Sequence, residues 1–166
     1  GAFGLKPGTV NGEILLNLDS EDEGELYIGC AGGMDVTASL EYKEVAPEEG
    51  DIAIRVNLKG LRGGHSGLEI NQGRANANKL LVRFIREAVA TYEARLASWE
   101  GGNMRNAIPR EAHAVVTIPA ENEEELLALV KYCEDLFNEE FKEIETPISF
   151  TAERVELPAG EVPEEI

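Results

Sequence analysis

Residues 51–59 read DIAIRVNLK, so that an apolar side chain occupies every second position from Ile52 to Leu58. Such alternation is typical of a β-strand with one buried face. From about residue 73 to 92, apolar side chains instead recur every three or four positions, which indicates an amphipathic helix. The rest of the chain predicts strands at 94–99 and 112–118, a second helix with its apolar stripe from Leu126 to Phe141, and an extended segment at 148–152.

The resulting order of strand, helix, strand, strand, helix and strand is the split βαβ, or ferredoxin-like, arrangement. We therefore expect an α+β fold, βαββαβ, with an antiparallel sheet and two helices on one face, which leaves the other face of the sheet bare. Alternation over residues 35–45 predicts an extra strand that pairs with 51–58 as a hairpin. Short apolar runs at 12–18 and 26–30 predict further N-terminal strands.

The turn-forming segment Ala-Gly-Gly at 31–33 marks a candidate domain boundary. Residues 1–33 and 34–157 are accordingly expected to be separate domains. The tail at 158–166 is rich in Pro and Glu and is expected to be flexible. Asn122, followed three positions later by Glu125, resembles a capping box and predicts the start of the second helix.

The composition of the chain limits the kinds of binding partner and the cellular compartment that we expect. The chain of 166 residues has a formal net charge of −17, which argues against nucleic acid and against anionic membrane surfaces as partners. It contains no apolar run of the roughly 20 residues that cross a bilayer and no visible signal peptide. The two cysteines, Cys30 and Cys133, read as buried free thiols, which indicates a reducing, cytoplasmic location.

Four residues are candidates for a functional site. His65 lies in the glycine-rich stretch 62–67 (RGGHSG), where it could contact a ligand or be a solvated loop side chain. Asn106 could be a turn residue or an amide donor to a carbonyl or carboxylate. Its neighbour Arg105 could be a surface charge or could bind a carboxylate. Asp19 ends an apolar run, a position where metal ligands occur, although a carboxylate there is weak evidence by itself.

The residues alone complete no catalytic chemistry. With two histidines, and neither cysteine near one in sequence, no nucleophilic triad can be assembled. A zinc site needs three or four His, Cys or carboxylate ligands, and none can be closed from the sequence. The acidic cluster at 21–25 reads as solvated, and His113 is expected on the surface of a strand without an assigned role.

Three strings together resemble one family: residues 15–21 (LLNLDSE) with 29–33 (GCAGG), residues 58–67 (LKGLRGGHSG), and residues 105–111 (RNAIPRE). Residues 75–81 (ANANKLL) support them. The chain resembles the aminoacyl-histidine dipeptidase (Xaa-His dipeptidase, peptidase D, carnosinase-like) branch of the M20 metallopeptidases. The resemblance covers roughly residues 10–120, and the combination is specific although each string alone is not.

The resemblance implies a catalytic domain with two zinc ions and an α+β lid domain that dimerises. Residues 1–33 would be the C-terminal edge of the first catalytic segment, and 34–157 the first part of the lid. Asp19 would be a zinc ligand, His65 would polarise the scissile carbonyl, and Asn106 with Arg105 would bind substrate.

The remaining metal ligands of the family would lie outside this chain. We therefore expect a fragment that binds zinc only weakly by itself and is inactive, within a parent homodimer that hydrolyses Xaa-His dipeptides such as carnosine. Its partners would be the dipeptide substrate, the missing catalytic domain of the same chain and a second copy. The alternatives are a stand-alone ferredoxin-like dimerisation or binding module, and the lid of another M20-type amidohydrolase.

Overall fold

The computed structural model describes residues 4–14, 16, 23–29 and 32–166. The chain divides into two compact units, residues 1–39 and residues 40–166. In the first unit, the described residues form no α-helix and no strand, and the side chains of Ile14, Leu16, Leu26 and Ile28 are exposed. The strands expected at 12–18 and 26–30 are therefore absent from the described parts of those runs, and their other residues lie outside the described chain.

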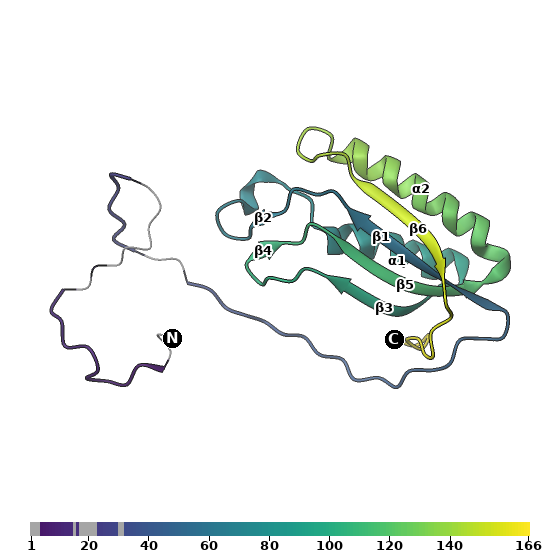
Figure 1. The fold of residues 1–166 in the computed structure, drawn as a ribbon, viewed down its shortest axis with the longest axis horizontal. Helices are drawn as coiled ribbons and strands as arrows, with labels where there is room; N and C mark the ends of the chain where they lie inside the picture. The colour runs from purple at the N-terminus through teal and green to yellow at the C-terminus, as the bar shows by residue number, and fades with distance from the viewer. Residues whose placement is uncertain (1–3, 15, 17–22, 30–31) are drawn as a thin grey trace. The chain divides into compact units, whose positions relative to one another are not determined.

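The second unit has the expected ferredoxin-like topology (Figure 1). Its four-stranded sheet has the order β3-β5-β1-β6, and all three pairings are antiparallel. Both helices lie on one side of the sheet, and a second, two-stranded ladder of β2 with β4 lies at one end of it (Figure 1). The elements are β1 (Asp51–Lys59), β2 (Gly64–His65), α1 (Ala77–Tyr92), β3 (Arg95–Gly101), β4 (Ala107–Ile108), β5 (Ala112–Pro119), α2 (Glu123–Glu140) and β6 (Ser149–Val155), with short 3-10 helices at Ile70–Gln72 and Ala120–Asn122.

Alternating apolar side chains build the core between the sheet and the helices. Ile54 of β1 faces Val116 of β5 in the antiparallel register, and both are almost fully buried. On the helix side, Phe84 of α1 meets Phe150 of β6 edge to face, with ring centroids 5.0 Å apart. Cys133 is a free thiol in this core, and burial raises its pKa, which keeps it protonated and unreactive.

Residues 35–45 do not form the predicted strand or a hairpin with β1. The neighbours of β1 are β5 and β6, and the segment makes a single bridge, between Val45 and Glu161. Val36 and Leu40 remain exposed, so the alternating pattern there has no apolar layer to pack against. Alternation alone does not make a strand, since a strand also needs cross-strand partners to pack against.

The C-terminal tail, expected to be flexible, makes defined contacts with β5 and with the edge strand β3. Glu161 is 4% exposed and accepts a hydrogen bond from the Thr117 hydroxyl, and the Val162 amide donates to the Leu96 carbonyl over 2.7 Å. This tail contributes to the burial of Thr117, which points away from the helices. The second face of the sheet is therefore covered in part rather than bare.

The two helices begin differently. Asn76 caps α1, since its side chain accepts a hydrogen bond from the Lys79 amide at 3.2 Å. The capping box predicted at Asn122 is wrong: its side chain makes no cap and instead donates to the Tyr92 carbonyl at the end of α1. Among the described residues, no helix combines the length and apolar character that crossing a bilayer requires.

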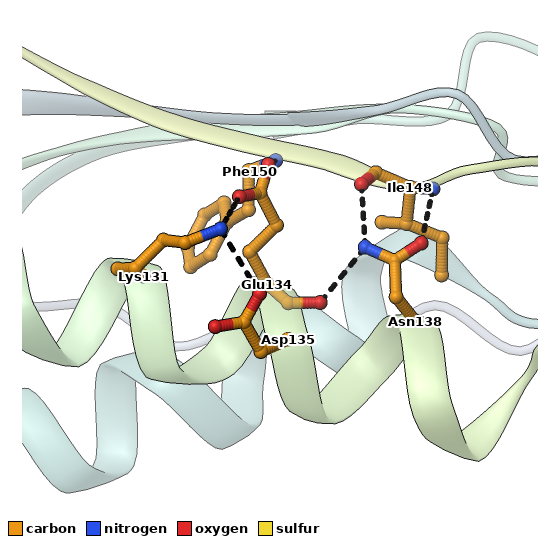
Figure 2. Close-up of polar contacts among 6 residues, drawn as sticks. All are labelled: Lys131, Glu134, Asp135, Asn138, Ile148 and Phe150. Carbon is orange, nitrogen blue, oxygen red and sulfur yellow. Dashed lines mark hydrogen bonds and ion pairs between the residues drawn. The ribbon is translucent and has the colours of Figure 1, made fainter.

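Polar side chains of α2 bind the backbone at the start of β6 (Figure 2). The Asn138 amide group accepts from the Ile148 amide and donates to the Ile148 carbonyl, each over 2.8 Å, as a neighbouring strand would. Glu134 accepts from the Phe150 amide at 3.0 Å and is itself paired with Lys131. The edge strand β6 is therefore blocked by its own helix at these positions, which discourages pairing with another chain there.

Candidate functional site

The two-residue ladder of β2 and β4 brings the predicted site residues together. Gly64 pairs with Ile108, and His65 pairs with Ala107. Immediately beside this pair, the Ser66 amide donates to the Asn106 carbonyl at 2.9 Å. His65, Arg105 and Asn106 are all exposed. Two sequence segments about forty residues apart thus place an imidazole, an amide and a guanidinium on neighbouring exposed turns.

The imidazole of His65 is held by its own turn. Its Nδ1 accepts hydrogen bonds from the amides of Gly67 at 3.0 Å and Leu68 at 3.1 Å, in the manner of a helix N-cap side chain. In the neutral ring, one nitrogen accepts and the other donates. Since Nδ1 accepts twice, the ring proton belongs on Nε2. His65 therefore presents one N–H donor in a fixed tautomer.

Glu69 closes the same turn from the other side. Its Oε2 accepts a hydrogen bond from the main-chain amide of His65 at 2.7 Å, while the His65 ring accepts from the amides of Gly67 and Leu68, so both side chains bind backbone amides of the same turn. Its Oε1 pairs with Arg74 at 2.6 Å, and Arg74 also donates to the Gly63 carbonyl at 2.5 Å. The hydrogen bond from His65, assisted by the charge of Arg74, lowers the pKa of Glu69 although burial opposes this shift.

A glycine is required at position 64 by this arrangement. Its φ of +143° is unusual for other residues, and a Cβ there would lie 2.5 Å from Arg74 Nη1 and 2.7 Å from Glu69 Oε2. A side chain at this position would push the Glu69–Arg74 pair apart. Gly64 therefore makes room for the pair that holds the turn, in addition to leaving the ring open.

A second carboxylate spans the neck of the segment from residue 60 to residue 75, which we call the His65 loop. Glu145, 8% exposed, follows α2 and accepts from the Arg62 amide at 2.7 Å and the Ala75 amide at 2.9 Å. The adjacent Thr146 hydroxyl donates to the Gly60 carbonyl. Glu145 thus ties both ends of the His65 loop to the α2–β6 connection, and Thr146 adds a second contact at the N-terminal end.

A hollow of about 620 Å³ adjoins the β2–β4 ladder. Gly64 and Ile108 line it from the ladder, together with His113 and Glu100, whose Nε2 and Oε2 are 3.0 Å apart. His65, Arg105 and Asn106 are not among its lining residues. The predicted substrate contacts therefore lie on the exposed turns and not in this hollow.

The metal prediction cannot be placed in the same way. Asp19 lies outside the described residues. In the described ranges, which omit 1–3, 15, 17–22 and 30–31, no group of three or more His, Cys, Asp or Glu side chains could hold a metal ion. The described residues thus do not form the two-zinc centre that the resemblance implies.

The residues that position the imidazole were not predicted from the sequence. Glu69, Arg74 and Glu145 had no predicted role, although Glu69 lies only four residues after His65 and binds its main-chain amide. Glu145 is separated from its partner Arg62 by 83 residues, so nothing local in the sequence could reveal that contact.

Comparison with known proteins identifies the segment that carries these features. Residues 56–145, more than half of the chain, match the model of the peptidase dimerisation domain (M20_dimer). The cytosol non-specific dipeptidase of Escherichia coli (strain K12) is 43% identical over 155 residues, which covers 93% of this chain and 32% of that protein.

A solved structure agrees with the sequence match. The crystal structure of aminoacylhistidine dipeptidase from Vibrio alginolyticus is 46% identical, with a TM-score of 0.77 over 97% of this chain and 33% of that chain. The resemblance to aminoacyl-histidine dipeptidases drawn from the three strings is thereby confirmed. The chain spans about a third of the length of both relatives, 32% and 33%.

Proposed function

Because the chain belongs to the family of peptidase dimerisation domains, we propose that residues 34–157 form the first part of the lid of a metal-dependent dipeptidase. Residues 1–33 would be the edge of its catalytic domain. The observation that carries the proposal is the exposed imidazole of His65, held in one tautomer beside Asn106.

In the reaction, His65 would donate from Nε2 to the oxygen of the scissile carbonyl. As water adds to the peptide, negative charge develops on that oxygen, and a donor that is already oriented stabilises it without reorganisation. The two backbone amides at Nδ1 support this role, because they leave Nε2 as the nitrogen that carries the proton. His65 would thus stabilise the transition state more than the bound substrate.

Asn106 and Arg105 would bind the ends of the dipeptide. An amide can both donate to a carbonyl or carboxylate and accept from an amide, and a guanidinium binds a carboxylate in a bidentate manner. Both residues lie on the turn before β4, within the segment that carries the partner strand of His65. A terminal carboxylate held there would fix the scissile bond relative to the imidazole.

Metal chemistry would come from the rest of the protein. The resemblance implies two zinc ions, which when bound would activate the attacking water, with Asp19 as the candidate ligand from this chain. The described residues cannot complete such a site, so the 166-residue chain alone is proposed to be inactive. The whole protein would be a homodimer through this domain and would act in the cytoplasm.

Substitution of His65 in the whole protein tests the proposal. We expect His65→Ala to lower kcat by about a hundredfold or more, the effect of removing one oxyanion donor, with a much smaller change in KM. The matched control is His113→Ala, which removes a half-buried imidazole paired with Glu100 and should leave both constants close to those of the parent. An unchanged kcat in His65→Ala would remove this residue from the mechanism.

Substrate choice is tested with the same protein. One relative is named a non-specific dipeptidase and the other an aminoacylhistidine dipeptidase, so we propose Xaa-His dipeptides such as carnosine as the preferred class. Initial rates on carnosine, on dipeptides without histidine and on N-acyl amino acids separate the possibilities. Comparable rates on all dipeptides would replace the preference with broad specificity, and turnover of N-acyl amino acids alone would indicate an amidohydrolase of another kind.

A further inference from the structure

We propose that Glu69 and Glu145 are positioning residues for His65, two carboxylates that clamp its loop at the tip and at the neck and so set the tautomer and direction of the imidazole. The inference rests on the proposed function for its effect on catalysis, but its structural part concerns the ring alone. Neither carboxylate touches the exposed edge of the imidazole, so both would act through the backbone.

The tip of the loop depends on Glu69. The two amides that bind Nδ1 belong to Gly67 and Leu68, which lie between His65 and Glu69 in one tight turn. That turn is closed by the Glu69 amide, which donates to the His65 carbonyl at 3.0 Å, and by the Glu69 side chain on the His65 amide. Without the Glu69 carboxylate, the turn loses one of these two hydrogen bonds, which together orient the Gly67 and Leu68 amides toward Nδ1.

The neck of the loop depends on Glu145. The amides of Arg62 and Ala75 come from opposite ends of the loop and meet on the two oxygens of one nearly buried carboxylate. Arg74, which holds Glu69, is the residue before Ala75, and the Gly63 carbonyl it binds follows Arg62. By holding Arg62 and Ala75 together, Glu145 therefore also sets the distance between Gly63 and Arg74, and with it the position of the Glu69–Arg74 pair.

Both positions need a carboxylate because each serves two donors. Glu69 receives the His65 amide and the Arg74 guanidinium, and Glu145 receives two backbone amides. A glutamine has one acceptor oxygen, and its NH₂ group would face a second donor. Glu→Gln at either site therefore preserves size and shape while losing at least one contact, and it leaves a donor opposed to a donor.

The direct test reads the ring of His65 in the 166-residue chain labelled with ¹⁵N-histidine. The chain has two histidines, so a His113→Gln chain assigns the signals. In the unsubstituted chain, long-range ¹H–¹⁵N correlation should show His65 with the proton on Nε2. In Glu69→Gln and in Glu145→Gln, we expect the two tautomers to become comparably populated, while the His113 signals stay unchanged.

The matched control is Glu140→Gln, which removes a carboxylate paired with Arg83 across the two helices at 2.8 Å. It should leave the His65 tautomer as it is. Because Glu145 is nearly buried and its variant could lose the fold, thermal unfolding is followed for each variant, and Glu69→Gln, at a partly exposed side chain, carries the test independently. A single, unchanged tautomer in folded Glu69→Gln would overturn the inference.

Kinetics of the whole protein then connect the clamp to catalysis. Misplacement of a catalytic group by a remote change typically costs rate more than binding, so Glu69→Gln should lower kcat by about tenfold with KM within about twofold. If the tautomer shifts but neither Glu69→Gln nor His65→Ala affects kcat, the proposed function fails while the clamp stands. If His65→Ala loses activity and Glu69→Gln alters neither the ring nor kcat, the clamp fails alone.

Discussion

In the sheet-and-helix body of the second unit, apolar side chains meet across two layers, whereas in the His65 loop carboxylates bind backbone amides. Phe84 and Leu81 on α1 are fully buried, and so is Val56 on β1. The loop instead exposes Leu68 and Ile70 and is held by Glu69, whose side chain is 33% exposed, and by Glu145. Apolar burial is non-directional, while each contact of the loop depends on the direction of one donor and one acceptor.

Because the two regions are held by different interactions, the body should determine the stability of the fold and the His65 loop the orientation of the imidazole. Cavities in the body should cost folding free energy without turning the imidazole, because the bonds that hold the ring and its turn come from residues 62–75 and from Glu145. Loss of a loop contact should cost less stability and alter the ring directly. Regions that carry function are commonly drawn from the less stable part of a domain.

The largest expected effect is in the body. Phe84→Ala removes a fully buried ring that packs on Phe150, and it should lower the free energy of unfolding by about 3–5 kcal/mol. Urea unfolding followed by circular dichroism measures the loss. Val82→Ala, at a position 43% exposed on the same helix, is the control and should change little. Equal losses in the two variants would contradict the assignment of the core.

A smaller loss is expected at the neck of the loop. Glu145→Ala leaves the amides of Arg62 and Ala75 without their acceptor, which should cost about 2–3 kcal/mol because buried donors would be unpaired. Hydrogen exchange of these two amides should accelerate more than that of amides in β1 and β5. Uniform acceleration over the whole unit would instead place Glu145 in the body of the fold.

As the pH falls, amides of the His65 loop should exchange faster before amides of the body do. The folded pKa of Glu69 is lowered from its usual value of 4.5 by the hydrogen bond from His65 and by Arg74, so its contribution is complete above pH 4.5 and is lost as the pH falls through the folded pKa. Exchange of the His65 amide, followed below pH 5 and compared with Glu69→Gln, measures this. The variant should show no such acid step, and an identical step in both would exclude Glu69 as its source.

The smallest effect is expected on the helix surface. Glu140→Gln breaks an ion pair with Arg83 in which both side chains are more than 40% exposed, 42% and 43%. Exposed pairs of this kind contribute about 0.2–1 kcal/mol, and high salt weakens them further. Thermal unfolding at low and high salt should place this variant within that range. If Glu140→Gln lowered the free energy of unfolding as much as Glu145→Ala, the loss of a carboxylate charge, and not the loss of bonds to backbone amides, would account for both variants.

The body was largely predictable from the sequence because its elements follow periodic patterns. The alternation in DIAIRVNLK gave β1, and the helical periods gave α1 and α2 within a few residues of their ends. Periodicity failed at residues 35–45, where an alternating segment makes only the bridge of Val45 with Glu161. It also missed the ladder of β2 with β4, since two residues in each strand are too few to show a period.

The site was predictable in part. The glycine-flanked His65 and the turn at Asn106 were identified as candidates, and the structure brings their segments together through β2 and β4. The clamps were not predictable, because Glu145 reaches Arg62 across 83 residues and a charged side chain in the sequence gives no sign that it will bind main-chain amides. Asp19 remains a prediction, outside the described residues.

The most direct test is a crystal structure of the whole protein with a phosphinic analogue of a dipeptide, whose tetrahedral oxygen mimics the transition state. The imidazole of His65 should lie with Nε2 about 2.7–3.1 Å from that oxygen, while Nδ1 keeps its bonds to Gly67 and Leu68. An analogue bound with the His65 ring turned to solvent, and with its oxygen held by other donors, would contradict the account.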